Sequence, residues 1–435
     1  MSKQIQDAYI VAAVRTPIGK APRGMFRNTR PDDLLVTAIR AAMAMVPSLD
    51  PNAVEDAIIG CAIPEGQQGL NVGRIAVLLA GLPQSVGGVT VNRFCASGLT
   101  TIAMAADRIR VGEADVMLAG GCESMSMVPM MGNAPSMNDR IFTDENIGIA
   151  YGMGLTAEKV AQQWKVSREA QDAFSVKSHQ KALAAQLSGA FADELTPVAI
   201  VERTPDLASG EIVTKSRNAD TDEGPRADTS MEGLAKLRAV FAAKGSVTAG
   251  NSSQTSDGAG ALLIVSERAL KQFNLTPLAR FVSFAIKGVD PKIMGIGPKE
   301  AIPLALKHAG LKQDDMGWIE LNEAFAAQAL AVIGDLGLNT DVVNPNGGAI
   351  ALGHPLGATG AMRAATAIHG ARRTKAKYSM VTMCVGTGMV RRAFSRPSDA
   401  TSLRACRPSD PLSTRPPSMR GASGTCPASW GSTSP

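Results

Sequence analysis

Two distant stretches of the chain share one design, and this repetition constrains the fold more than any other feature. Each stretch runs from a glycine-containing turn with a reactive side chain into a helical pattern, and then into a strand-like run that ends at a cysteine. The first comprises Cys95-Ala-Ser-Gly98, 99–111, 116–119 and Cys122, and the second comprises Gly353-His-Pro-Leu-Gly357, 358–370, 378–383 and Cys384. Strands that alternate with helices are typical of layered α/β folds. The pattern favours two similar halves, each with a reactive residue at a helix entrance.

The segment between these halves differs in composition. It contains a methionine-rich stretch, two helical patterns and a polar run rich in Thr, Asp, Gly and Arg. We interpret it as a loop domain inserted into the first half. The predicted organisation is an N-terminal half formed by 1–122 and 246–270, an inserted loop domain at 123–245, a C-terminal half at 271–389 and an aberrant tail at 390–435.

The net charge of +5 is confined to the end of the chain. Residues 390–435 contain seven Arg, two Asp and neither Lys nor Glu, so the preceding residues are neutral overall. The basic balance therefore gives no argument for a nucleic-acid surface. Basic and aromatic residues do not interleave elsewhere as they do on such surfaces, and we expect no nucleic-acid partner.

Simple counts exclude other classes of protein. The sequence has no apolar stretch of membrane-spanning length, so no membrane insertion is expected. Its first residues lack the basic, apolar and small-residue order of a signal peptide. The six cysteines form no CxxC pair, and with only four histidines no metal site is expected. We expect a cytoplasmic protein with reduced thiols.

Three residues stand out as chemically reactive. Cys95 lies between a strand-like run and a helix, where the partial positive charge of the helix N-terminus favours a thiolate; a buried structural cysteine fits equally well. His354 lies in a glycine-lined turn that matches the cysteine turn of the other half, which favours a functional histidine. Cys384 follows a strand and precedes glycines whose N–H groups could face a developing oxyanion, with a core cysteine as the alternative.

Two further motifs are less specific. Asn322 lies between a strand-like run and a helix, where it could cap the helix or present its amide to a water or carbonyl. Ala249-Gly-Asn-Ser-Ser-Gln254 is rich in Gly and Ser but lacks the Lys of a P-loop. Together, a nucleophilic cysteine, a histidine and a second cysteine are what thioester exchange coupled to carbon–carbon chemistry needs. One thiol holds the acyl group, and the other shuttles a proton.

Taken in order over 6–389, these motifs resemble those of the thiolases, specifically the degradative 3-ketoacyl-CoA thiolases. The residues that carry the resemblance are Val11-Ala-Ala-Val-Arg-Thr-Pro-Ile-Gly19, Asn92-Arg-Phe-Cys-Ala-Ser-Gly98, Gly120-Gly-Cys-Glu-Ser-Met-Ser126, Gly250-Asn-Ser-Ser-Gln254, Asn322-Glu-Ala-Phe325, Asn346-Gly-Gly-Ala-Ile-Ala-Leu-Gly-His-Pro-Leu-Gly357 and Cys384-Val-Gly-Thr-Gly388. The resemblance implies the thiolase fold, an α/β fold with two similar βαβαβαββ halves. These halves stack in an α-β-α-β-α layered arrangement, with an inserted loop domain.

The resemblance also implies roles for individual residues. Cys95 would be the acylated nucleophile, His354 the base that activates it, and Cys384 the second acid/base. Asn322 would hold a water that forms one oxyanion hole together with His354. The backbone N–H groups of Cys95 and Gly386 would form the other.

The same resemblance implies how substrate binds. Ser253 would contact the pantetheine arm of CoA, Arg226 would lie near its nucleotide end, and Met153 would contact the substrate. Gly152 stands where short-chain biosynthetic thiolases have His, which would leave room for longer acyl chains. The expected partners are acyl-CoA and CoA, and CoA is a substrate, so no cofactor is expected. The family resemblance also implies a homodimer or homotetramer.

The sequence departs from the family after Met389. Val-Arg-Arg-Ala-Phe follows where the family has glycine and small apolar residues of a last core strand. Adjacent Arg391 and Arg392 would point to opposite faces of a sheet, and burying a guanidinium without a partner costs several kcal/mol. We therefore expect this strand to be displaced or frayed and the Ser- and Pro-rich tail to be disordered.

The expected function is that of an acetyl-CoA C-acyltransferase. It would cleave 3-ketoacyl-CoA with CoA into acetyl-CoA and a shortened acyl-CoA, as in fatty-acid β-oxidation, through an acyl-enzyme on Cys95. One alternative is a biosynthetic acetoacetyl-CoA thiolase, which runs the same chemistry as a condensation. The other is a catalytically impaired CoA- or acyl-binding protein, because of the aberrant C-terminus.

Overall fold

The computed structural model describes residues 5–397 and contains one large sheet with helices on both sides of each half. Its strands are β1 (Ala8–Arg15), β2 (Gly19–Lys20), β3 (Asp56–Gly60), β4 (Val89–Val91), β5 (Val116–Ser124), β6 (Val198–Pro205), β7 (Ile212–Ala219), β8 (Ser256–Ser266), β9 (Ala279–Gly288), β10 (Met316–Leu321), β11 (Tyr378–Val385) and β12 (Met389–Pro397). Its helices are α1 (Pro31–Ala44), α2 (Val72–Leu79), α3 (Ser97–Arg110), α4 (Met153–Gln163), α5 (Arg168–Leu187), α6 (Met231–Ala235), α7 (Glu267–Gln272), α8 (Gly297–Ala309), α9 (Ala326–Leu336), α10 (Ala349–Leu352) and α11 (Leu356–Arg373).

The sheet repeats one pattern of strand pairing. In the first half, β3 runs parallel to β5, β5 antiparallel to β8, and β8 antiparallel to β1. In the second half, β10 runs parallel to β11, β11 antiparallel to β12, and β12 antiparallel to β9. The halves meet where β1 and β9 pair over two residues of each strand. The predicted two similar halves are therefore confirmed.

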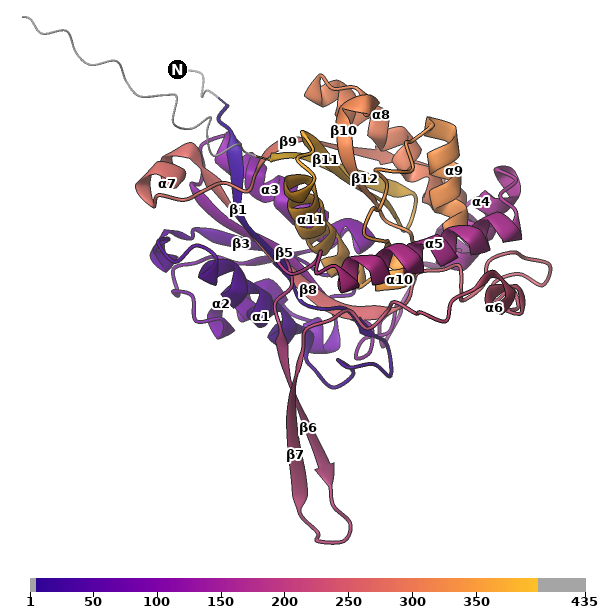
Figure 1. The fold of residues 1–435 in the computed structure, drawn as a ribbon, viewed down its shortest axis with the longest axis horizontal. Helices are drawn as coiled ribbons and strands as arrows, with labels where there is room; N and C mark the ends of the chain where they lie inside the picture. Colours follow the sequence, from indigo (N-terminus) through magenta and orange to yellow (C-terminus); the bar gives the residue numbers. More distant parts are fainter. Residues whose placement is uncertain (1–4, 398–435) are drawn as a thin grey trace, which may run out of the picture. The chain divides into compact units, whose positions relative to one another are not determined.

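Three apolar cores separate the layers. The first packs α1 and α2 against the outer face of the first half, and the third packs α8 and α9 against the outer face of the second half. The second core lies between the halves and contains α3 and α11 (Figure 1). Along each strand, alternate residues face opposite cores, as in β1, where Val11 faces the first and Ile10 the second. This is the predicted α-β-α-β-α arrangement.

Glycines let the two central helices cross closely. A side chain on Gly98 of α3 would meet the backbone of Gly357 and Ala361 in α11, and one on Gly360 would collide with the backbone of Leu99. Only glycine leaves room for such a backbone approach. The crossing lies in the first turns of both helices, so it fixes the helix entrances that follow Cys95 and His354 relative to each other.

The segment between β5 and β8 carries α4, α5, the β6–β7 hairpin and α6. In Figure 1 the hairpin extends away from the layers, whereas α5 lies close to α9 and α10. Arg15 of β1 ties this segment to the sheet through buried ion pairs with Glu194 (2.5 Å) and Asp222 (2.8 Å). The predicted boundary at 270 lies within α7, between the two halves.

The last described strand corrects one expectation. Residues 389–397 form β12, which pairs with β11 on one side and with β9 on the other. The expectation that this strand is displaced is therefore wrong, and the predicted tail begins inside a strand. The physical reason is that a backbone in this slot satisfies the N–H and C=O groups of both neighbours, whatever its side chains. The remainder of the predicted tail, 398–435, lies outside the described residues.

Candidate active site

Cys95 lies in a short turn immediately before α3. Residues 94–96 form a 3-10 turn, in which Phe94 adopts a positive φ of 44°, and α3 begins at Ser97. The Cys95 side chain is 8% exposed. The backbone N–H groups of Gly386 and of Cys95 itself lower the pKa of its thiol. Burial nevertheless raises the pKa of the thiol to about 11, so Cys95 is protonated at rest near neutral pH.

Cys384 lies near the end of β11, and the turn after it approaches Cys95. Burial raises the pKa of its thiol, and the nearby Cys95 raises it further. A side chain on Gly386 would meet Met153 and Phe94 at van der Waals distance. The structure therefore brings Cys95, Cys384, Gly386 and Met153 together at one place.

An apolar cluster surrounds Cys384. Its members come from the inserted segment, the turn before α8 and the loop before α9, and they are Met153, Ala157, Val247, Met294, Ala324 and Phe325. Two of these six are methionines, which are flexible and adapt to apolar ligands of different shape. Next to Met153, a side chain on Gly152 would meet no atom within 4 Å, so the space beside this position is open.

His354 is buried, and its hydrogen bonds fix its tautomer. Its Nδ1 lies 2.7 Å from Oγ1 of Thr359, and that hydroxyl donates to the carbonyl of Pro355 (2.9 Å). Nδ1 must therefore carry the proton that it donates to Thr359, which leaves the lone pair on Nε2. Burial, and then the charge of Arg363, lower the pKa of His354 to about 3. The imidazole is thus neutral, with Nε2 free to act as a base.

Asn322 contacts the basic nitrogen of this histidine. Its Nδ2 lies 3.3 Å from Nε2 of His354, while its Oδ1 is buried with no hydrogen-bond partner among the described residues. Asn322 follows β10, and its backbone N–H donates to Thr382 of the parallel neighbour β11. Because parallel strands end at one edge of the sheet, Asn322 lies near Cys384. An unpaired buried oxygen is a site that a water or a substrate N–H would satisfy.

Ser253 and Arg226 lie in the loops beside this site. The backbone N–H of Ser253 donates to Ala324, two residues after Asn322, and its side chain is half-buried. Arg226 is exposed, and its backbone N–H donates to Nδ1 of His179 (3.1 Å). Among the described residues, Ser253 adjoins the reactive residues through this backbone contact, whereas Arg226 makes no contact with them.

Two positioning residues escaped the sequence analysis. Thr359, which sets the tautomer of His354, lies one helical turn inside α11 in the same motif, so its spacing was a usable signal. Glu123 is buried and accepts from the backbone N–H groups of Ala62 and Gly357 (both 2.7 Å). It thereby holds the start of α11 against the end of β3. No sequence pattern joins these three segments.

Residues 5–397 contain neither a cluster of metal-ligating side chains nor a helix that could span a membrane. No three histidine, cysteine, aspartate or glutamate side chains in this part of the chain gather as they would around a metal ion. Within the same residues, every helix is too short or too polar to span a bilayer.

Comparisons with known proteins cover nearly all of the described chain. The model of the thiolase N-terminal domain matches residues 8–268, and that of the thiolase C-terminal domain matches residues 275–394. A 3-ketoacyl-CoA thiolase of Bacillus subtilis (strain 168) is 47% identical over 385 residues, which are 88% of this chain and 98% of the relative. A beta-ketoadipyl-CoA thiolase of Acinetobacter baylyi is 46% identical over 401 residues, again 88% and 98% of the two chains.

Solved structures give the same result. The crystal structure of human mitochondrial 3-ketoacyl-CoA thiolase matches with a TM-score of 0.80 at 38% identity, over 90% of this chain and 99% of that one. Its complex with CoA matches with a TM-score of 0.80 at 37% identity, over 91% and 98%. Both halves match their family model, and the relatives are covered almost from end to end. The chain therefore belongs to the thiolase family.

Proposed function

We propose that this thiolase cleaves 3-ketoacyl-CoA with CoA to give acetyl-CoA and an acyl-CoA shortened by two carbons. The observation that carries the proposal is that Cys95 lies beside Cys384 and the backbone N–H of Gly386, while the neutral His354 contacts Asn322 at the end of β10. Relatives from Bacillus subtilis and human mitochondria that bear the name 3-ketoacyl-CoA thiolase support the same reaction. The biosynthetic condensation of two acetyl-CoA is the reverse reaction on the same residues.

In the first half-reaction, Nε2 of His354 takes the proton of Cys95 as the sulphur attacks the 3-keto carbon. With pKa values of about 11 and about 3, this proton transfer is unfavourable in the resting site. Attack becomes possible because the negative charge passes to the substrate oxygen, where hydrogen-bond donors stabilise it. The bond between C2 and C3 then breaks, C2 takes the proton of Cys384, and acetyl-CoA leaves.

In the second half-reaction, CoA removes the acyl group from Cys95. The thiolate left on Cys384 accepts the proton of the incoming CoA thiol, whose sulphur attacks the thioester carbon. Cys95 leaves as a thiolate and recovers a proton from His354. The N–H groups of Cys95 and Gly386, which face the Cys95 sulphur, would hold the thioester oxygen in this step. No step needs a cofactor or metal, and CoA is a substrate.

The proposal is tested by thiolysis of a substrate series followed by loss of 3-ketoacyl-CoA absorbance. We expect turnover of acetoacetyl-CoA and of longer 3-ketoacyl-CoA, because the space beside Gly152 is open. Because one relative is named beta-ketoadipyl-CoA thiolase, the series also includes 3-ketoadipyl-CoA as an alternative substrate. Turnover restricted to acetoacetyl-CoA would favour the biosynthetic alternative. Absence of turnover with every substrate, in the presence of CoA binding, would favour the impaired binding protein.

Arg226 should contribute to CoA affinity rather than to chemistry. We propose that its exposed guanidinium meets a phosphate of CoA, while Ser253 contacts the pantetheine arm and Met153 the acyl end. Arg226→Ala is then expected to raise the KM for CoA roughly threefold to tenfold and to change kcat little. Steady-state kinetics with varied CoA measures this. The control is Arg203→Ala in the hairpin, and an equal KM in the wild type and Arg226→Ala would remove Arg226 from the site.

We also propose that the chain assembles as a homodimer or homotetramer through the edge of the first half. Strand β4 is the outer strand there, paired only with β3 among the described strands, and such an edge offers unpaired backbone groups. Exposed Val89 and, on adjacent α2, Leu78 and Leu79 add apolar surface. Light scattering at micromolar concentration should show a dimer or larger.

A charge at this edge should weaken the assembly. Val89→Asp is expected to shift the population toward monomer, because burying a carboxylate at an apolar interface is costly. Leu187→Asp, at an exposed helix end, is the matched control. A monomer in the wild type would overturn the proposed assembly. We further propose a cytoplasmic location, consistent with four described cysteines that are free thiols.

A further inference from the structure

A cavity lies outside the cysteine site, between α5, α9 and the loop before α10. Its volume is about 210 Å³, larger than the roughly 150 Å³ apolar cavity that suffices to bind benzene. Six of its lining residues come from one face of α5, at positions 170, 173, 174, 177, 178 and 181. The cavity is therefore roomy enough for a small organic molecule.

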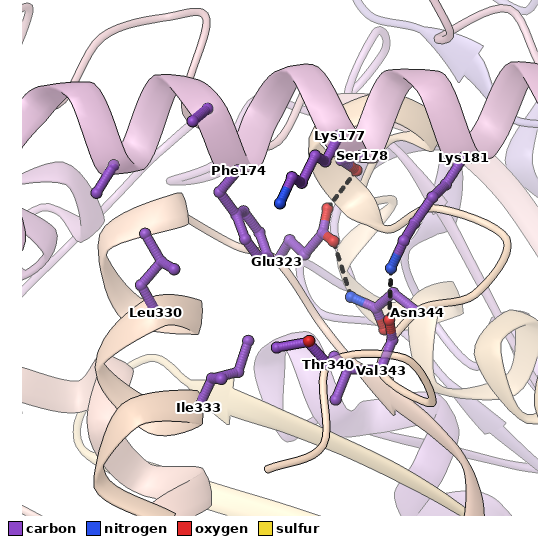
Figure 2. Close-up of a pocket in the computed structure, with 12 residues that line it drawn as sticks. Phe174, Lys177, Ser178, Lys181, Glu323, Leu330, Ile333, Thr340, Val343 and Asn344 are labelled. Atoms are coloured by element: carbon purple, nitrogen blue, oxygen red, sulfur yellow. Dashed lines mark hydrogen bonds between the residues drawn. The ribbon is translucent and has the colours of Figure 1, made fainter. Parts of the chain in front are cut away.

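The cavity has one apolar end. Phe174 of α5 and Leu330 and Ile333 of α9 gather there (Figure 2), and Ala173 also lines the cavity. The opposite side holds Lys181 and Asn344. A ligand with an apolar tail and one polar group would fit this cavity, because the tail would contact apolar side chains and the polar group would contact polar ones.

Two lysines line the cavity, Lys177 beside Phe174 and Lys181 beside Asn344, with the carboxylate of Glu323 between them (Figure 2). Lys177 is exposed and forms no ion pair or hydrogen bond within residues 5–397. Lys181 is half-buried and donates one hydrogen bond, to the carbonyl of Val343 (3.0 Å), although an ammonium has three donors. Within the same described residues, Lys181 forms no ion pair. Burial lowers the pKa of Lys181, and the nearby Glu323, Glu320 and Asp341 oppose this effect, so Lys181 already has anionic surroundings.

Glu323 is the one acidic group that lines the cavity, and other partners already occupy its oxygens. Oε2 accepts from Oγ of Ser178 (2.6 Å) and from the backbone of Ile350 (3.3 Å), and Oε1 accepts from Asn344 (2.8 Å). Glu323 also faces Lys181, whose pKa it raises. Lys177 is thus left available for a ligand.

We propose that this cavity binds a small carboxylate with a short apolar tail, such as a medium-chain fatty-acid anion. The carboxylate contacts Lys177, and the tail lies against Phe174, Leu330 and Ile333. The site does not rest on the proposed reaction, because none of its lining residues holds or receives the acyl group. Its position links it to catalysis, since Glu323 directly follows Asn322, which contacts His354.

The test is calorimetric titration of the full chain with hexanoate, hexanamide and hexylamine, which share a tail and differ in charge. Hexanoate should bind, and hexanamide should bind about tenfold more weakly or not at all, because a charge-assisted hydrogen bond is lost. Lys177→Glu should weaken hexanoate binding by at least about tenfold, and Ala173→Phe should abolish it by filling the apolar end. Lys307→Gln, an exposed lysine on α8, is the control and should bind as the wild type does.

Each other outcome overturns the proposal. No binding of hexanoate at millimolar concentration shows that the cavity holds only solvent. Equal binding of hexanoate and hexanamide shows that charge has no part in recognition. Preference for hexylamine shows that Glu323 dominates the site. Undiminished hexanoate binding in both Lys177→Glu and Ala173→Phe, with both variants folded by circular dichroism, places the ligand elsewhere.

Discussion

Cys95→Ser should lower kcat for thiolysis by at least ~10³-fold, because the acyl group loses its attachment point. Incubation of the wild type with an acyl-CoA should add the mass of one acyl group, as measured by intact mass spectrometry. Cys95→Ser should lose this adduct. The physical reason is that a serine hydroxyl in the same buried site is far harder to deprotonate than a thiol whose pKa is already about 11.

Cys384→Ser is the matched control, because it changes the same atom at the neighbouring position. It should still acquire the acyl adduct on Cys95, but it should fail to cleave or form the carbon–carbon bond, since the acid for C2 is gone. Normal turnover by Cys95→Ser would show that the nucleophile has been wrongly assigned. An adduct that disappears in Cys384→Ser and persists in Cys95→Ser would exchange the two roles.

His354→Gln should lower the rate of acyl-enzyme formation by roughly 10²–10⁴-fold, the usual contribution of a general base. Nε2 of His354 is the unprotonated nitrogen of a neutral imidazole whose pKa is about 3, so glutamine removes the base while keeping a polar side chain. Stopped-flow release of CoA from acyl-CoA measures this step directly. An unchanged rate would exclude His354 as the base.

The resting enzyme has a corresponding pH dependence. A thiol whose pKa is raised to about 11 is protonated below that value, so alkylation of Cys95 by iodoacetamide should accelerate as pH rises toward 11. The rate of alkylation should not reach a plateau near pH 7. Alkylation of Cys95 is best followed by peptide mass spectrometry, because the chain has five other cysteines. A plateau that begins below pH 7 would instead indicate a preformed thiolate–imidazolium pair.

The repeated pattern of turn, helix, strand and cysteine indicated two similar α/β halves, and the thiolase resemblance supplied their layered arrangement. The repeat was a usable signal because each half must bury one strand face and one helix face in the same order. Both central helices begin and end within a few residues of their predicted bounds. The same pattern placed Cys95, His354 and Cys384 at element ends. A helix start and a strand end are local features, which residue spacing and glycine determine.

The prediction for the residues after Met389 was wrong because their structure depends on distant strands and not on local features. Side-chain pattern argued against a strand, but β12 fills the slot between β11 and β9, where both neighbours need hydrogen-bond partners. A vacancy in the middle of a sheet leaves two rows of backbone groups unpaired. This hydrogen-bonding requirement depends on the neighbouring strands of the sheet, so it cannot be predicted from the nine residues of β12 alone.

The sequence by itself determined which residues are chemically able to carry thioester chemistry and where along the helices and strands they stand. Only the tertiary structure determined the contacts, the tautomer and the pKa values of these residues. The N–H of Gly386 reaches the sulphur of Cys95 across the two halves, Thr359 fixes the tautomer of His354, and Glu123 joins the start of α11 to the end of β3. The shifted pKa values follow from burial, which depends on every layer packed around the site. Burial and contacts between distant segments arise only when the chain is folded, and no local pattern encodes them.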